Sequence, residues 1–277
     1  MPRIIKFSVT ILVSLFMLQN KANANTNSRD SVNYYLRESK KYSYSDFNKA
    51  KFYLVKAERV AKKLNNKNLI ADVIYNFGSN YYIIGSYDIA LQNYIKASEI
   101  YDSENNKIGL AKCLMGKGLI QQGFGRDKEA LKNFKKSITI CRALKDKKIT
   151  IKNLLNIGVS QTNLNEYDEA YKSFKESLKL SVKNKSTEDS QMAMNKLANI
   201  HYMKNNLDST IYYYQKVLDD SVKPNLWEEA YAFSGLSEAY LKKGDYQKAI
   251  DFGLKGYNAA KIVRAKWDIA RSAEIIS

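Results

Sequence analysis

The single histidine and the two cysteines are the side chains most able to do chemistry. His201 lies in a segment whose apolar residues recur at three and four spacing, which is typical of a helix, and no Ser or Cys motif surrounds it. Nucleophilic catalysis needs a base beside the nucleophile, and a structural zinc site needs about four ligands. We therefore expect His201 to be a packed, hydrogen-bonded core residue. Cys113 and Cys141 are interpreted as small buried apolar residues, with a disulfide as the alternative in an oxidising compartment.

The acidic residues and the glycines show no catalytic motif. Glu166, Asp168 and Glu169 stand together in an expected turn, where negative charge favours the start of a helix. The glycines follow a long regular spacing and form no phosphate-binding loop. The sequence therefore predicts a protein that is not an enzyme and that uses no cofactor and no metal.

The chain of 277 residues carries a formal charge of +17. A strongly basic chain can bind nucleic acid or an anionic membrane surface. The lysines are scattered along the sequence with acids between many of them, and no dense basic arm is present. This pattern favours a solvated helical surface and makes a nucleic-acid-binding regulator the weaker alternative.

The N-terminus has the three parts of a secretory signal. Arg3 and Lys6 precede a short, mostly apolar run at 7–18, and Ala22 and Ala24 occupy the two positions that signal peptidase reads. We expect cleavage after Ala24, giving an exported periplasmic or secreted protein. An uncleaved anchor is the alternative. Cleavage removes three basic residues from a charge of +17 and leaves +14.

One pattern recurs along most of the chain. Gly or Asn, any residue, Tyr and then an Ala three residues later appear at Gly85 to Ala90, Asn165 to Ala170 and Gly244 to Ala249. The alanine-equivalent positions are 50, 90, 130, 170, 210 and 249, so the period is forty residues with one shorter step. A fixed period of this length indicates a repeat architecture.

A second signature precedes each turn, and the best copy reads Ile74-x-x-Phe77-Gly78-x-x-Tyr81. Together the two signatures resemble the tetratricopeptide repeat. The resemblance implies an all-α superhelical solenoid of antiparallel helix pairs over residues 30–277, after a signal peptide at 1–24 and a linker at 25–29. Because the period exceeds the usual length of about thirty-four, each pair is expected to be longer. This variant is similar to the exported sensor regions of bacterial signalling proteins.

The repeat predicts helix pairs at about 30–65, 68–105, 107–145, 148–185, 187–221 and 225–262, with a final half-pair from about 265. Gly and Asn accept the left-handed conformation that ends a helix, which predicts turns at Gly85, Gly125, Asn165, Asn205 and Gly244. Ser86, Asn206 and Asp245 are expected to cap the next helices. Small residues are expected where paired helices touch, with Gly78 facing Ala90 and Ala97, Gly118 facing Ala130 and Ser137, and Gly158 facing Ala170 and Ser177. The aromatics expected between neighbouring pairs are Tyr94, Phe134, Phe174 and Tyr214.

In the family that the chain resembles, the first helix of each pair lines a concave groove that contacts a protein or an extended peptide. The resemblance implies the following lining residues: Tyr75, Asn76, Ser79, Tyr82, Met115, Gln122, Lys152, Asn156, Asn195, Lys196, Asn199, Tyr202, Tyr231 and Glu238. An asparagine amide can grip both sides of a peptide bond, although Asn is simply common in this chain. The carboxylate clamp of some family members is incomplete, because Leu155 and Gly235 occupy positions where polar residues would be required.

We therefore expect an exported protein- or peptide-binding scaffold that forms the sensory N-terminal part of a bacterial signal-transduction protein. A free-standing periplasmic or secreted adaptor is the alternative. Nucleic acid is not expected as a partner, and a membrane is expected only through an uncleaved signal or a missing C-terminal segment. The half-pair from about 265 is expected to pack against the helix at about 246–262 with an exposed apolar side. Its sequence predicts that the natural polypeptide is longer, or that the last helix of a truncated product is frayed or covered by a partner chain. The alternative is a short terminal helix that caps the array adequately.

Overall fold

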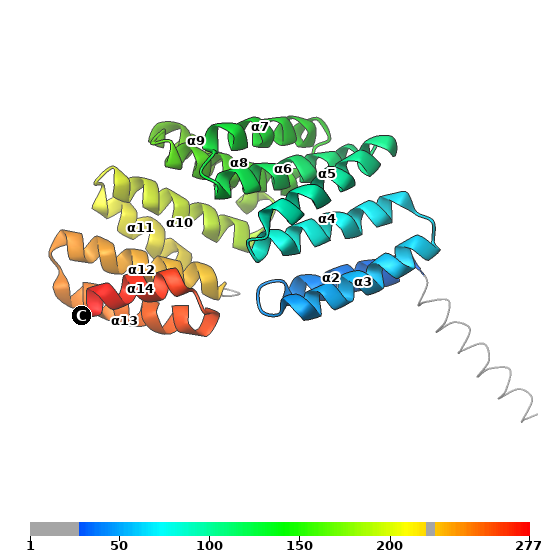
Figure 1. Cartoon of the computed structure of the whole chain (residues 1–277). Helices are drawn as coiled ribbons and strands as arrows, with labels where there is room; N and C mark the ends of the chain where they lie inside the picture. Colours follow the sequence, from blue (N-terminus) through cyan, green and yellow to red (C-terminus); the bar gives the residue numbers. More distant parts are fainter. Residues whose placement is uncertain (1–27, 220–224) are drawn as a thin grey trace, which may run out of the picture. The chain divides into compact units, whose positions relative to one another are not determined.

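The computed structural model describes residues 28–219 and 225–277, and these ranges consist of α-helices joined by short turns (Figure 1). The expected signal peptide at 1–24 and most of the expected linker lie outside the described residues. The first pair contains α2 (Arg29–Tyr42) and α3 (Phe47–Lys63). The later helices are α4 (Lys67–Ile83), α5 (Tyr87–Ser103), α6 (Lys107–Gly123), α7 (Asp127–Ala143), α8 (Lys147–Asn163), α9 (Tyr167–Lys183), α10 (Thr187–Met203), α11 (Leu207–Asp219), α12 (Leu226–Lys243), α13 (Tyr246–Val263) and α14 (Lys266–Ile276).

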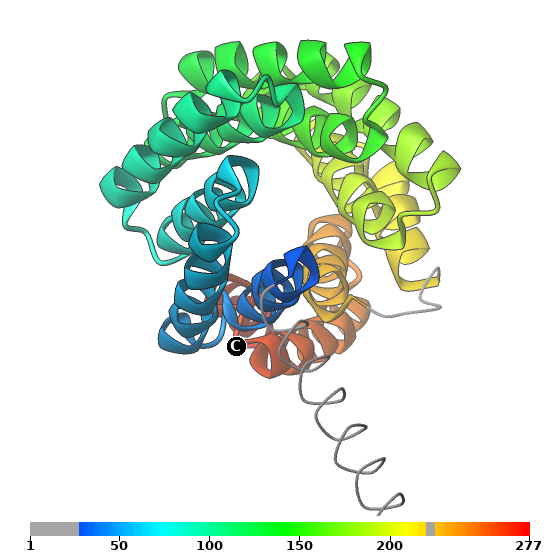
Figure 2. The same ribbon diagram turned by 90° about the vertical axis from the view of Figure 1, so that its right-hand side faces the viewer.

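The predicted forty-residue period is confirmed. The first helices of four successive pairs begin at residues 67, 107, 147 and 187, and α12 begins at 226. Each helix from α3 to α10 has 17 residues, so the extra length of the repeat lies in the helices. Consecutive helices pack against one another within each part of the chain (Figures 1 and 2).

The five turns predicted inside the pairs have left-handed backbone, with φ between 59° at Asn165 and 83° at Gly244. A second set of left-handed turns separates one pair from the next, at Asn65, Asn105, Lys145, Lys185 and Arg264. Residue type did not predict the turns at Lys145, Lys185 and Arg264, because Lys and Arg have no special preference for the left-handed conformation. Asp245 and Asn206 cap their helices as expected, whereas Ser86 makes no side-chain capping bond.

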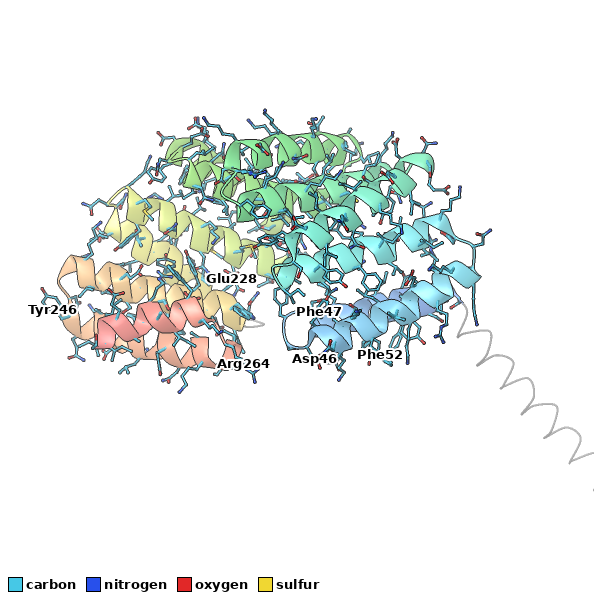
Figure 3. All side chains as sticks on the ribbon, in the orientation of Figure 1. Asp46, Phe47, Phe52, Glu228, Tyr246 and Arg264 are labelled. Carbon is cyan, nitrogen blue, oxygen red and sulfur yellow. The ribbon has the colours of Figure 1, made fainter. Side chains whose placement is uncertain are left out.

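The chain divides into two compact units, one up to Ile120 and the other from Gln121. In the first unit the Tyr94 ring is buried between two glycines, as expected for an aromatic between neighbouring pairs. A Cβ at Gly78 would lie 2.9 Å from this ring, and one at Gly116 would lie 2.6 Å from it. Not every aromatic of the first unit is buried in this way: Phe52 of α3 points outward and is 53% exposed (Figure 3).

In the second unit the buried aromatics Phe134, Phe174 and Tyr214 occupy the same repeat position. At Gly158 the structure shows a neighbour that the sequence did not predict. The nearest atoms to a Cβ built there belong to the Phe174 ring, the closest at 2.4 Å. A Cβ at Gly235 would likewise meet the Tyr214 ring, at 2.2 Å. These glycines leave space for an aromatic ring, and Gly78 also lies close to Ala90 as expected, since a Cβ there would be 3.2 Å from the Ala90 carbonyl oxygen.

The final half-pair packs as expected. Helix α14 lies against α13 and also contacts α12 (Figure 1). Two small residues of α13 permit the approach, since a Cβ at Gly256 would lie 2.8 Å from Ser272 Oγ and one at Gly253 would lie 3.2 Å from Ile276. The apolar side is partly uncovered, as predicted, with Trp267 75% exposed.

The side chains with possible chemistry are placed inside the helical packing. Cys113 and Cys141 are buried free thiols, as favoured from the sequence, and burial raises their pKa to about 12 and about 11. The His201 ring is half-buried between Tyr171 and Tyr213, with ring centroids 5.6 and 5.4 Å away. Burial and the nearby Lys204 lower the pKa of His201. No helix of the described residues is long and apolar enough to cross a membrane.

Candidate functional site

The residues predicted to line a groove fall in both units. Tyr75, Asn76, Ser79, Tyr82 and Met115 belong to α4 and α6 of the first unit, and the other nine belong to the second. In the second unit the first helices α8, α10, α12 and α14 are neighbours in that order. We call the side of these helices that carries the predicted residues the first-helix face.

In the first unit the predicted residues are largely engaged in local contacts. Asn76 Nδ2 donates to the carbonyl oxygen of Asp72 at 2.7 Å, within its own helix. Ser79 Oγ lies 3.3 Å from the Tyr94 hydroxyl, and Met115 is only 9% exposed. Burial raises the pKa of Tyr75 to about 12. Tyr82 is half-buried with its ring 5.6 Å from that of Tyr87. These residues therefore offer limited polar surface to a ligand.

The first part of the first-helix face carries Lys152, Asn156 and Asn199, which are half-buried. Gln122 Nε2 donates to Ser160 Oγ at 2.8 Å and to the Asn156 carbonyl oxygen at 3.2 Å, and so joins the end of α6 to α8. The Asn156 and Asn199 side chains thus remain the best candidates for amide contacts with a ligand backbone.

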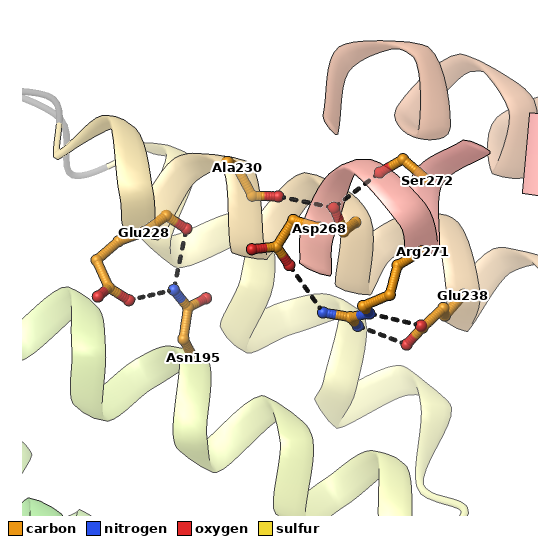
Figure 4. Close-up of polar contacts among 8 residues, drawn as sticks. Asn195, Glu228, Ala230, Glu238, Asp268, Arg271 and Ser272 are labelled. Carbon is orange, nitrogen blue, oxygen red and sulfur yellow. Dashed lines mark hydrogen bonds and ion pairs between the residues drawn. The ribbon is translucent and has the colours of Figure 1, made fainter. Parts of the chain in front are cut away.

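Asn195 is placed differently from its prediction as a groove contact. The residue is fully buried, and its Nδ2 donates to the Glu228 carbonyl oxygen at 3.0 Å and to Glu228 Oε2 at 2.7 Å (Figure 4). The polar position that repeat counting assigned to the ligand therefore links α10 to the first turn of α12. Burial raises the pKa of Glu228, against the opposing effect of the Asn195 hydrogen bond.

Aromatic rings and cations alternate further along the face. The Tyr231 ring has Lys196 Nζ 4.9 Å and Arg271 Cζ 5.1 Å from its centroid. Tyr202 has Lys242 Nζ at 4.8 Å, and burial together with the charge of Glu238 raises its pKa. Cations over aromatic faces contribute about 0.5–1 kcal/mol each at exposed sites. Lys196, Tyr202 and Tyr231 are thus held in position before any ligand arrives.

Arg271 of α14 is a residue that sequence reasoning missed. Its Nε and one terminal nitrogen donate to both oxygens of Glu238 at 2.8 and 2.6 Å, and the other terminal nitrogen donates to Asp268 at 3.2 Å (Figure 4). Burial lowers the pKa of the guanidinium, but the bonds and charge of Glu238 outweigh this and raise it. The repeat could have predicted Arg271 as a lining residue, because Arg271 follows the predicted lining residue Tyr231 by one forty-residue period.

A pocket of about 380 Å³ opens beside this cluster. Its walls include four residues already described, and the full lining is Tyr202, Glu238, Leu241, Lys242, Arg271, Glu274 and Ile275. A small cleft with apolar walls and a few converging polar groups is suited to a side chain of a bound ligand. This face of the second unit thus combines a row of half-buried polar side chains with a recess at its far part.

The fold and this face define a class of protein, an α-helical repeat solenoid. Residues 69–143 match a family profile described as tetratricopeptide repeat, and residues 151–184 match a second profile with the same description. The chain therefore contains tetratricopeptide-type repeats over these residues. A search of curated protein sequences returned no match.

Several solved structures share the fold at low sequence identity. Aspartyl phosphate phosphatase F from Bacillus subtilis is 17% identical with a TM-score of 0.60, over 88% of this chain and 68% of that chain. A Rap protein complexed with competence and sporulation factor is 14% identical with a TM-score of 0.65, over 88% and 72%. NprR in complex with its cognate peptide NprX is 17% identical with a TM-score of 0.61, over 82% and 66%.

Proposed function

We propose that this protein is a binding scaffold that holds an extended peptide or a segment of another protein on its first-helix face. One observation carries the proposal. Successive first helices of the second unit keep Asn156, Lys196, Asn199 and Tyr202 half-buried rather than covered by other helices. Solved structures of the same fold include complexes with peptides, named as competence and sporulation factor and NprX.

The chemistry of the face suits a peptide backbone. Side-chain amides supply both a donor and an acceptor, so they can pair with each peptide group of an extended chain. Each such bond contributes about 0.5–1.5 kcal/mol net. The fixed positions of Tyr202 and Tyr231 reduce the entropy lost on binding, because their rings are already held by Lys242 and Lys196. The ligand is to be found by affinity capture from native extracts, followed by mass spectrometry.

Replacing Asn156 and Asn199 together with alanine is expected to weaken binding of the captured peptide about tenfold, as two modest hydrogen bonds predict. Stability should change little, because both side chains are partly in solvent. Titration calorimetry and thermal melts measure the two effects. Asn258→Ala, at an exposed position of α13, is the matched control. Equal peptide affinity in the double variant and in the control would contradict the assignment of these amides.

We further propose that the protein is exported and acts as the sensory part of a bacterial signal-transduction protein. The support is the basic, apolar and small-residue pattern of residues 1–24. We expect the mature chain from the native host to begin at Asn25, which N-terminal sequencing checks. A mature chain that begins at Met1 and is recovered with the cytoplasmic fraction would refute export.

A further inference from the structure

The second helix of the first pair, α3, differs in charge from its counterpart in the next pair. Helix α3 contains six lysines and arginines and one acid, whereas α5 contains one lysine and three acids. All six cations of α3 are exposed. Lys62 pairs with Glu58 at 2.6 Å, and the charged groups of the other five make no ion pair among the described residues. Helix α3 therefore presents several cations that are available to an anionic partner.

These cations share one side of α3 with two apolar side chains. At 3.6 residues per turn, all six fall on roughly half of the helix circumference, with Phe52 and Val55 between them. We call this side of α3, formed by the six cations, Phe52 and Val55, the basic face. Phe52 points outward and is 53% exposed (Figure 3), and Val55 is 44% exposed. The opposite side is buried and carries Ala50, Leu54 and Ala57. Cations around exposed apolar residues on one helix face are typical of a helix that lies on a membrane surface.

The repeat does not require an aromatic residue at position 52. The residues at the same position in the next three repeats are polar, namely Gln92, Lys132 and Lys172. One further period along, Tyr212 of α11 is 55% exposed and meets its neighbour Tyr213 edge-on. Phe52 meets Tyr53 in the same way. Helix α11, however, contains one lysine and two acids. The two helices therefore carry a similar exposed aromatic pair, and α3 alone of the two surrounds it with positive charge.

Two lysines of the basic face lie over aromatic rings. Lys56 Nζ is 4.3 Å from the centroid of Phe52, and Lys49 Nζ is 3.9 Å from that of Tyr42. The Tyr42 ring also stacks on Tyr53, with the centroids 5.9 Å apart. Single-stranded nucleic acid is bound through bases that stack on open aromatic faces. Because these ring faces are already partly occupied, a surface of lipid phosphates suits the basic face better than a nucleic acid.

We propose that the basic face of α3 binds the surface of a bilayer that contains anionic phospholipids. In this arrangement the lysines and Arg59 lie at the lipid phosphates, and Phe52 and Val55 enter the boundary between headgroups and acyl chains. Both kinds of contact strengthen binding to a membrane surface. The basic face belongs to the first unit, so the inference does not depend on peptide binding at the first-helix face. It is also separate from the uncleaved signal and the C-terminal segment that the sequence suggests as routes to a membrane.

The test measures how strongly the full chain binds vesicles of phosphatidylcholine alone, or of equal parts of phosphatidylcholine and phosphatidylglycerol. The triple variant Lys51→Gln, Lys56→Gln, Arg59→Gln should bind the anionic vesicles at least about tenfold more weakly than the unmodified chain. The matched control removes three exposed cations of α7, through Lys132→Gln, Lys135→Gln and Lys136→Gln, and should stay within about twofold. Residues 1–24 are the same in every variant, so their own affinity for lipid does not affect the comparison.

A second pair of variants tests the apolar contact. Phe52→Gln introduces the residue that the next repeat has at this position, and should weaken binding to the anionic vesicles about fivefold, because apolar area no longer enters the lipid. Tyr212→Gln changes the equally exposed aromatic of α11 and should leave binding unchanged.

Three results would overturn the proposal. The first is equal binding of neutral and anionic vesicles, or no binding of either, by the unmodified chain. The second is an equal loss in the α3 and α7 triple variants, because any cation would then count alike. The third is equal binding of Phe52→Gln and Tyr212→Gln, which would mean that the face attracts a soluble polyanion, such as an acidic protein, without entering a bilayer. Thermal melts check folding, and the comparison of Phe52→Gln with Tyr212→Gln decides even if the α3 triple variant does not fold.

Discussion

Gly158→Leu is expected to lower the free energy of unfolding by about 3 kcal/mol, the upper end of the usual cost of overpacking a core. Even a Cβ at this position would lie 2.4 Å from the Phe174 ring, and the ring is itself only 1% exposed. The ring has little room to move, because Ala193, Leu197 and Ala170 belong to the same buried cluster. The added side chain must therefore separate α8 from α9 and disturb the stacking of the next pair.

Urea unfolding followed by circular dichroism measures this change. Lys172→Leu adds the same side chain at an exposed position of α9 and should change stability by less than about 0.5 kcal/mol. Phe174→Ala alone should cost about 3–5 kcal/mol through the cavity it leaves. Combined with Gly158→Leu it should cost less than the sum, because the leucine fills part of that space. Additive costs in the double variant would mean that the two positions do not touch.

Arg271→Ala is expected to cost roughly 3–5 kcal/mol, because it removes the guanidinium that binds Glu238 and Asp268 and leaves these partly buried carboxylates without it. The Arg271 side chain is 15% exposed, and those of Glu238 and Asp268 are 29% and 12% exposed. Removing the guanidinium also takes away one of the two cations over Tyr231 and leaves Lys196. We expect α14 to detach locally before the rest of the second unit unfolds, since this cluster ties it to α12.

Arg142→Ala is a matched control. Arg142 makes an ion pair with Glu176 at 2.6 Å, the same distance as the shorter Arg271 contact with Glu238, but its side chain is 52% exposed. A surface pair of this kind contributes about 0–1 kcal/mol.

Adding Glu238→Gln and Asp268→Asn to Arg271→Ala should recover part of the loss by removing the unpaired charges. Amide hydrogen exchange should show faster exchange in α14 of Arg271→Ala; unchanged protection there would contradict the proposed tie.

The sequence by itself determined the repeat and the limits of its helices. These are local properties, because a glycine or asparagine at a fixed position ends one helix and an apolar stripe at three and four spacing forms the next. The turns at Gly85, Asn165 and Gly244 are left-handed for this reason. Repetition made the assignment of the repeat specific, since several copies that agree in phase are far more specific than one match. The forty-residue period also predicted the start of α14 to within two residues.

Tertiary structure decided how side chains meet across helices. Asn195 and Asn199 stand one turn apart on α10, yet the first is fully buried against Glu228 and the second is half-exposed. The nearest neighbour of Gly158 is the Phe174 ring, which sequence counting did not pair with it. Arg271 binds the Glu238 carboxylate, 33 positions earlier in the chain, as well as lying over the Tyr231 ring one full period earlier. Periodicity fixes which face of a helix a residue occupies, but the crossing angle and the shift between neighbouring helices fix which residue lies opposite.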